Sequence, residues 1–178
     1  MIAGSDGTDA LVVQRVAAGP HASGAFATYA LPHAHGVVFE PAHQHLWADG
    51  AGRVRIYDWH DGTLAPVRDL ALPSGDAHDL VADPAGGGLI VTTGAHVWRI
   101  DATSLASTPF APLADRPGIT GVAIEAVSGA LAYVQAEDHR WWSERVHVVT
   151  QGGAERTLHL PGRQLYKVRW DQSGWLVR

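Results

Sequence analysis

The sequence of 178 residues contains no cysteine, one methionine and one lysine. The absence of cysteine excludes disulfides, thiolate catalysis and cysteine-ligated zinc or iron–sulfur sites, and it is compatible with either redox compartment. No run of apolar residues approaches the roughly 18 that a membrane-spanning helix needs, so we expect no membrane span. The basic residues are scattered and the net charge is −5, so we expect no nucleic-acid-binding face.

Two further signals are missing. Residues 1–7 have neither a basic segment nor an apolar segment of the kind that begins a secretion signal. The chain as written is therefore expected to be cytoplasmic, and an exported protein is expected if its N-terminus is incomplete. Helical periodicity is also absent, whereas 46% hydrophobic and 17% charged residues are typical of a globular domain. Abundant alanine and glycine, with arginine in place of lysine, indicate a bacterial source.

The sequence does contain one repeat, which occurs in three copies. Each copy has an apolar strand, a hairpin turn, a second apolar strand and a third, alternating strand. The copies occupy residues 34–58, 77–101 and 119–149. Aligning them puts His35, His78 and Thr120 in register, at steps of 43 and 42 residues. A period of roughly 40–45 residues with four short strands is typical of β-propeller blades.

We therefore predict an all-β fold, a β-propeller with about four blades of four antiparallel strands, as a single domain over residues 1–178. The predicted parts are a partial blade at 1–33, full blades at 34–76, 77–118 and 119–164, and the start of a further or closing blade at 165–178. The last part would contain an inner strand at 165–170, because Tyr166 follows Thr120 by 46 residues, and a short strand at 174–177.

The two ends of the chain leave two arrangements open. The strand at 165–170 would pair with the N-terminal strand at 1–7 and close a four-bladed ring. Alternatively, the chain is a partial, truncated propeller that lacks blades of a longer homologue. An open arc leaves apolar blade faces in water, so the second arrangement predicts self-association through those faces.

The segments 31–39 and 77–80 carry a resemblance to a known family. The His-Gly-Val-Val-Phe and His-Asp-Leu blade starts resemble an uncharacterised bacterial β-propeller family, and Trp141-Trp142-Ser143-Glu144 is similar to a later element of that family. The resemblance covers roughly residues 25–150. It implies the fold, longer relatives that are often exported, and no assigned activity. A more distant similarity is to gluconolactonase-like and other sugar-processing propellers.

The first candidate site is formed by His35 and His78. Equivalent positions at the starts of adjacent inner strands line the same end of a propeller channel, so we expect these two imidazoles to lie close together. They could bind a divalent metal ion as cofactor, or act as acid and base. Asp79 could orient an imidazole or complete the ligand set. The alternative is that both histidines form structural hydrogen bonds within or between blades.

The second candidate site is a long loop that the other two repeats lack. Its acidic, guanidinium and paired indole side chains are those that stack on sugar faces and hydrogen-bond sugar hydroxyls. They are Glu137, Arg140, Trp141 and Trp142. The alternative is that the two tryptophans pack at the start of a strand. The blade tryptophans Trp47, Trp59 and Trp98 are expected to be packing residues.

Three functions follow from these residues. The first is a ligand-binding module for a saccharide or other polar small molecule at the channel mouth. The second is a metal-dependent hydrolase or lyase that uses His35 and His78. The third is a WD-like scaffold that binds a protein partner. Whether the chain is an enzyme stays open, because it contains no phosphate-binding loop, nucleophile elbow, zinc-protease motif or EF-hand.

Overall fold

A computed structural model describes residues 2–5, 9–16, 22–61, 63–137 and 139–170. The described strands form four antiparallel sheets, of which the first has three strands and the others four. The first sheet contains β1 (Ile2–Ser5), β2 (Ala10–Val16) and β3 (Ala22–Ala30). The second contains β4 (Gly36–Glu40), β5 (His45–Gly50), β6 (Arg53–His60) and β7 (Thr63–Ala71).

The third and fourth sheets repeat this meander. The third contains β8 (Ala77–Ala82), β9 (Gly88–Thr93), β10 (Val97–Asp101) and β11 (Ser107–Pro109). The fourth contains β12 (Ile119–Ile124), β13 (Leu131–Gln135), β14 (Arg145–Val149) and β15 (Glu155–His159). The helix of the described chain is one 3-10 turn, η1 (Ala111–Leu113). No helix of the described residues is long and apolar enough to cross a membrane.

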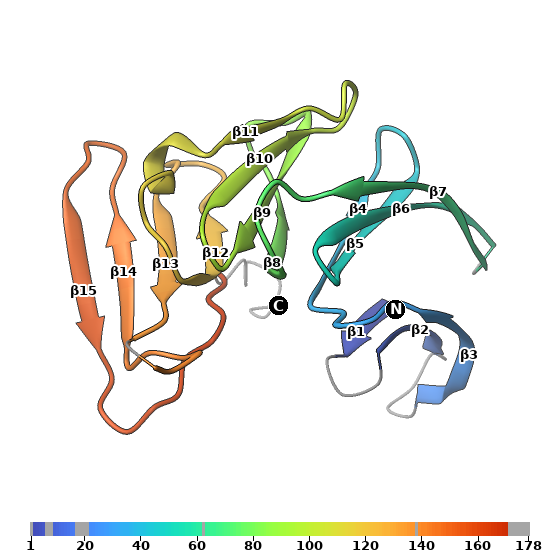
Figure 1. Cartoon of the computed structure of the whole chain (residues 1–178), viewed down its shortest axis with the longest axis horizontal. Helices are drawn as coiled ribbons and strands as arrows, with labels where there is room; N and C mark the ends of the chain where they lie inside the picture. The colour runs from blue at the N-terminus through green and yellow to red at the C-terminus, as the bar shows by residue number, and fades with distance from the viewer. Residues whose placement is uncertain (1, 6–8, 17–21, 62, 138, 171–178) are drawn as a thin grey trace, which may run out of the picture.

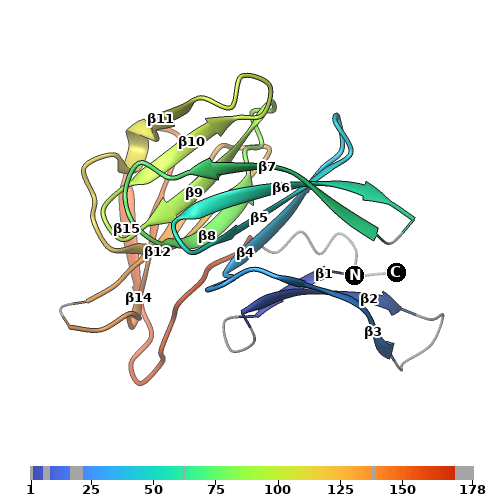
Figure 2. The same cartoon turned by 45° about the vertical axis from the view of Figure 1, so that its right-hand side comes forward.

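The sheets follow one another around a common centre (Figures 1 and 2). Strands β4, β8 and β12 each begin a sheet, and β8 contacts both of the other two. These are the inner strands of propeller blades. The predicted all-β propeller fold, with four-stranded antiparallel blades, is therefore confirmed.

The apolar core is divided into layers between adjacent sheets. Leu11 of the first sheet packs with Tyr57 of the second, and Trp47 of the second packs with Leu89 of the third. A third cluster, which includes Tyr133, joins the third sheet to the fourth. The blade tryptophans are packing residues as predicted: Trp47 is fully buried, and Trp59 and Trp98 pack against the same clusters. Since each blade buries its faces against its neighbours, the inner strands are held in a fixed register across blades.

The predicted inner strand at 165–170 was wrong. Leu165 makes an isolated bridge with Ser143, and residues 166–170 form no strand with the described part of the chain. The segment instead runs along β12 and is held there mainly by side-chain hydrogen bonds. Pairing of this segment with the N-terminal strand is likewise not found among the described residues. The strand predicted at 174–177 lies outside them.

Candidate functional site

Four equivalent positions of the repeat meet where the inner strands begin. The rings of His35 and His78 lie 5.8 Å apart between centroids. The hydroxyl of Tyr166 lies 3.3 Å from Nδ1 of His35 and 3.4 Å from Nδ1 of His78. Thr120 completes the set, since its hydroxyl donates to the carbonyl of Tyr166 at 2.9 Å. The predicted proximity of the two imidazoles is confirmed, and Tyr166 is the group that joins them.

Burial determines the protonation state of His78. Its pKa is lowered from the ordinary value because burial disfavours the imidazolium, and the nearby charges of His35 and Lys167 add to this effect. Asp76 opposes it, as a negative charge favours the imidazolium. Burial therefore favours the neutral imidazole of His78. A neutral imidazole can donate one hydrogen bond and accept another.

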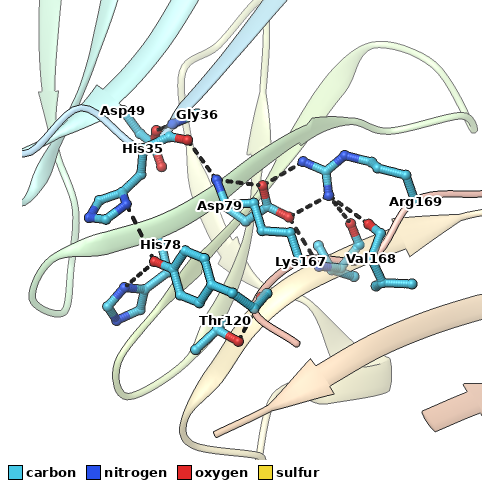
Figure 3. A network of polar contacts seen from close by, with 11 residues as sticks. His35, Gly36, Asp49, His78, Asp79, Thr120, Lys167, Val168 and Arg169 are labelled. Carbon is cyan, nitrogen blue, oxygen red and sulfur yellow. Dashed lines mark hydrogen bonds and ion pairs between the residues drawn. The ribbon is translucent and has the colours of Figure 1, made fainter. Parts of the chain in front are cut away.

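Asp79 lies in the same polar network, and its carboxylate binds Arg169. Its carboxylate is fully buried and accepts from Arg169 at 2.7 Å (Nη1) and 2.6 Å (Nη2). It also accepts from the backbone N–H of Val122 at 3.1 Å. Figure 3 shows Asp79 between the histidines and Arg169. This carboxylate holds the segment 166–170 against β12, and its role in orienting an imidazole stays a prediction.

Lys167, the lone lysine of the chain, lies in the same network. Its ammonium donates to the carbonyl of His35 at 2.6 Å and lies 3.4 Å from Asp79 Oδ1. The sequence analysis missed Lys167 and Tyr166 as site residues. The signal was present, however, since the register that equates Tyr166 with His35 and His78 also places Lys167 beside them.

Asp49, at the end of β5, is a second buried carboxylate that the sequence analysis missed. Its Oδ1 accepts from the backbone N–H of Gly36, and its Oδ2 has no hydrogen-bond partner among the described residues. Burial raises its pKa to about 6, and the nearby ammonium of Lys167 opposes this rise.

The long loop between β13 and β14 divides into two parts. Trp141 reaches the histidine site: its ring lies 5.3 Å from that of Tyr166, edge to face, and the residue is 62% exposed. The others lie apart from the imidazoles. Arg140 stacks over the ring of Trp142 at 4.6 Å, and Glu137 accepts from Arg145 at 2.7 Å. The structure therefore joins Trp141 to the histidine site, which we call the mouth site (His35, His78, Trp141, Tyr166).

A cavity of about 360 Å³ lies further along the channel. Its walls are aliphatic residues of the three inner strands, together with Arg169 and Trp170. Trp170 donates to the carbonyl of Ala123 at 3.2 Å, and Arg169 donates to that of Val122 at 3.3 Å. The segment 166–170 thus donates side-chain hydrogen bonds to two carbonyls of β12 and contributes two residues to the wall of this cavity.

The predicted metal site has two imidazoles. Nδ1 of each faces the phenol of Tyr166, so a metal ion would have to use Nε2. Within the described ranges, no group of three or more His, Asp or Glu side chains is arranged to hold an ion. The role of His35 and His78 as metal ligands stays a prediction.

No protein-family model and no curated protein sequence matches the chain. Solved structures do match, and they are propeller-like. A candidate 6-phosphogluconolactonase from Bacteroides uniformis has a TM-score of 0.64 and 11% identity, over 88% of this chain and 52% of that one. A streptogramin B lyase has a TM-score of 0.56 and 16% identity, over 94% of this chain and 54% of that one. A nidogen–laminin complex has a TM-score of 0.56 and 14% identity, over 80% of this chain and 54% of that one.

These similarities define the class of protein: the chain is a β-propeller domain. It spans about half the length of the solved structures that it matches. The remote similarity to gluconolactonase-like propellers agrees with the first of them. The identities are low, so the likeness carries the fold and not the chemistry.

Proposed function

We propose that this propeller is a ligand-binding module for a saccharide or another polar small molecule at the mouth site. The supporting observation is that Trp141 leaves most of its surface exposed while its ring contacts Tyr166, which in turn contacts both imidazoles. An exposed indole stacks on the apolar face of a sugar ring, and adjacent imidazoles exchange hydrogen bonds with its hydroxyls. Ligand sites in proteins typically combine apolar and aromatic surface with a few convergent polar groups.

The remaining residues of the predicted site have supporting roles in this proposal. Glu137 and Arg140 line a separate open cavity next to the same loop. They would contact a ligand that extends outward past Trp141, with Trp142 as the surface on which Arg140 rests. Asp79 would act indirectly, because it anchors the segment that carries Tyr166.

The test is a thermal-shift screen with neutral sugars, sugar acids and sugar lactones. A ligand at 100 times its Kd stabilises the folded state by about 2.7 kcal/mol, which such a screen detects. Replacing Trp141 by alanine removes a stacking contact of roughly 0.5–1.5 kcal/mol, so we expect binding about 2- to 12-fold weaker. The matched control is Leu158→Ala, which truncates an equally exposed apolar residue on β15. A ligand that binds wild type and Trp141→Ala equally well would contradict the proposal.

A metal-dependent hydrolase or lyase is the second candidate. The short distance of 5.8 Å between the two imidazole rings favours this function. Two of the proteins with a similar fold are a candidate lactonase and a lyase. Metal analysis of the purified protein decides: stoichiometric metal that is lost in His35→Ala and in His78→Ala would favour this function. A metal-free protein whose ligand binding depends on Trp141 would favour the binding module.

A protein-interaction scaffold is the third candidate, since the same fold occurs in the nidogen–laminin complex.

A further inference from the structure

The channel cavity of about 360 Å³ shares no wall residue with the mouth site. It lies toward the ends of β4, β8 and β12, whereas the mouth site lies where these strands begin. Its walls are aliphatic side chains of the three strands, together with Arg169 and the indole of Trp170. Small-molecule sites in proteins have volumes of roughly 300–1,000 Å³, so this cavity can hold a small ligand with an apolar body.

Arg169 adds a positive charge to these apolar walls. Its Nη1 and Nη2 donate to the two oxygens of Asp79 at 2.7 and 2.6 Å, and Nη1 also donates to the carbonyls of Val122 and Val168 (Figure 3). A guanidinium holds its N–H groups in one plane, so Nε–H and the second Nη2–H lie together on the neighbouring edge. Among the described residues, no acceptor lies on that edge. The side chain is 50% exposed, so this pair of donors is open to a ligand.

The charges around Arg169 permit an additional anion. The carboxylate of Asp79 lies between two cations, since the ammonium of Lys167 is 3.4 Å from its Oδ1. Asp49 is a second carboxylate near Lys167, and burial raises its pKa to about 6. These four groups are together neutral when Asp49 is ionised and positive when it is protonated. They therefore carry no net negative charge that would repel a carboxylate from Arg169.

We propose that the channel cavity is a second ligand site, which binds a small aliphatic carboxylate. The carboxylate accepts from Nε–H and Nη2–H of Arg169, and the hydrocarbon chain packs on the aliphatic walls and on Trp170. Two-point pairs of arginine and carboxylate are strong and specific, and each buried methylene strengthens binding by about 4-fold. A sugar does not fit these walls, because its hydroxyls would be left without hydrogen bonds. This site is independent of the ligand proposed for the mouth site.

A nuclear magnetic resonance titration of ¹⁵N-labelled protein with sodium hexanoate tests the site. The reporter is the indole N–H of Trp170, which lines the cavity and donates to the carbonyl of Ala123 at 3.2 Å. Trp170→Phe identifies its signal among the seven tryptophans. We expect a saturable shift with hexanoate. Acetate, which lacks the chain, and hexanol, which lacks the charge, should each bind at least about 10-fold more weakly.

Ala82→Trp tests whether hexanoate occupies the cavity. Ala82 is an exposed residue of the cavity wall, so a large side chain there takes up cavity space without entering the core. We expect this variant to lose hexanoate binding. The matched control is Ala71→Trp, at an exposed position on β7 that does not line the cavity, and it should bind as wild type does. The ¹⁵N spectrum of each variant shows whether it is folded.

Arg169→Lys tests the recognition of the carboxylate. Lysine keeps a positive charge but has no second pair of donors, so hexanoate should bind about 10-fold more weakly while hexanol binding stays unchanged. Equal weakening of both ligands would show a general loss of the cavity and would contradict the role of the guanidinium.

Two other results would overturn the site. One is hexanoate binding no tighter than that of hexanol or acetate, and the other is hexanoate binding that Ala82→Trp leaves unchanged. Trp141→Ala should bind hexanoate as wild type does, because Trp141 belongs to the mouth site and not to the cavity wall. Failure of the sugar screen and failure of the carboxylate site are therefore distinguishable.

Discussion

Removing the carboxylate of Asp79 should release the segment 166–170 and destabilise the protein. Asp79 is fully buried and accepts two hydrogen bonds from Arg169 and one from the Val122 N–H. Breaking a buried ion pair by deleting one partner costs about 3–5 kcal/mol of the free energy of unfolding. The side chain of Arg169 is 50% exposed and can recover hydration, so the low end of that range applies.

The uncompensated cost is then mainly that of the backbone N–H of Val122, roughly 1–3 kcal/mol for an unsatisfied buried donor. For Asp79→Ala we expect a loss of about 3 kcal/mol in all, which lowers Tm by roughly 6–12 °C in a domain of this size. Asp79→Asn should lose less, because its amide oxygen still accepts from Val122 while the charge is gone.

Asp69 provides a matched control. It also accepts two hydrogen bonds from one arginine, from Nε of Arg55 at 2.6 Å and from Nη2 at 2.8 Å, but both side chains are partly exposed. Exposed ion pairs contribute about 0–1 kcal/mol, so Asp69→Ala should change the free energy of unfolding by no more than this. Urea unfolding of the two variants measures the difference directly.

Lys167 reports on the segment itself. As the chain has one lysine, an amine-specific reagent followed by mass spectrometry measures its reactivity, with the α-amino group as internal reference. We expect faster labelling of Lys167 in Asp79→Ala than in wild type or in Asp69→Ala. Equal destabilisation by the two alanine variants, or unchanged labelling of Lys167, would refute this account of how the segment is anchored.

Three further predictions concern single residues. Gly121→Ala should destabilise the protein by roughly 1–3 kcal/mol and expose Lys167 to labelling, because a Cβ at residue 121 would lie 2.7 Å from the Lys167 Cα. Gly152→Ala is the neutral control in urea unfolding, because a Cβ at residue 152 would have open space around it. Asp49→Asn should gain stability relative to wild type as the pH rises from 4 to 7, because a carboxyl whose pKa is raised to about 6 in the folded state favours unfolding once it ionises. A difference in the free energy of unfolding between the two proteins that is constant with pH would contradict this. The pKa of Glu155 is lowered to about 2, chiefly by hydrogen bonds from Arg116, so its stabilising effect is present above pH 4.5 and is lost as the pH falls toward 2. In Glu155→Gln the free energy of unfolding, measured between pH 5 and 2, should fall less steeply with acid than in wild type.

The repeat in the sequence determined the fold and the convergence of the two histidines. Residues at equivalent positions of successive blades occupy equivalent places around the channel, so a step of 42–46 residues is enough to bring His35 and His78 together. The same register contained Tyr166 and Lys167. Their part in the site was predictable from the sequence, although only the histidines suggested chemistry.

Other features were decided by contacts between distant parts of the chain. Asp79 and Arg169 are 90 residues apart, and no local pattern indicates that one neutralises the other. The loop that carries Trp141 has no counterpart in the other repeats, so only its packing against Tyr166 separates it from Arg140 and Glu137. Periodicity could not foresee that residues 166–170 would bond to β12 through side chains instead of forming a strand, because apolar alternation is the same in both cases. A repeat places backbones in register, whereas the partners of buried charges depend on which side chains the completed fold brings within reach.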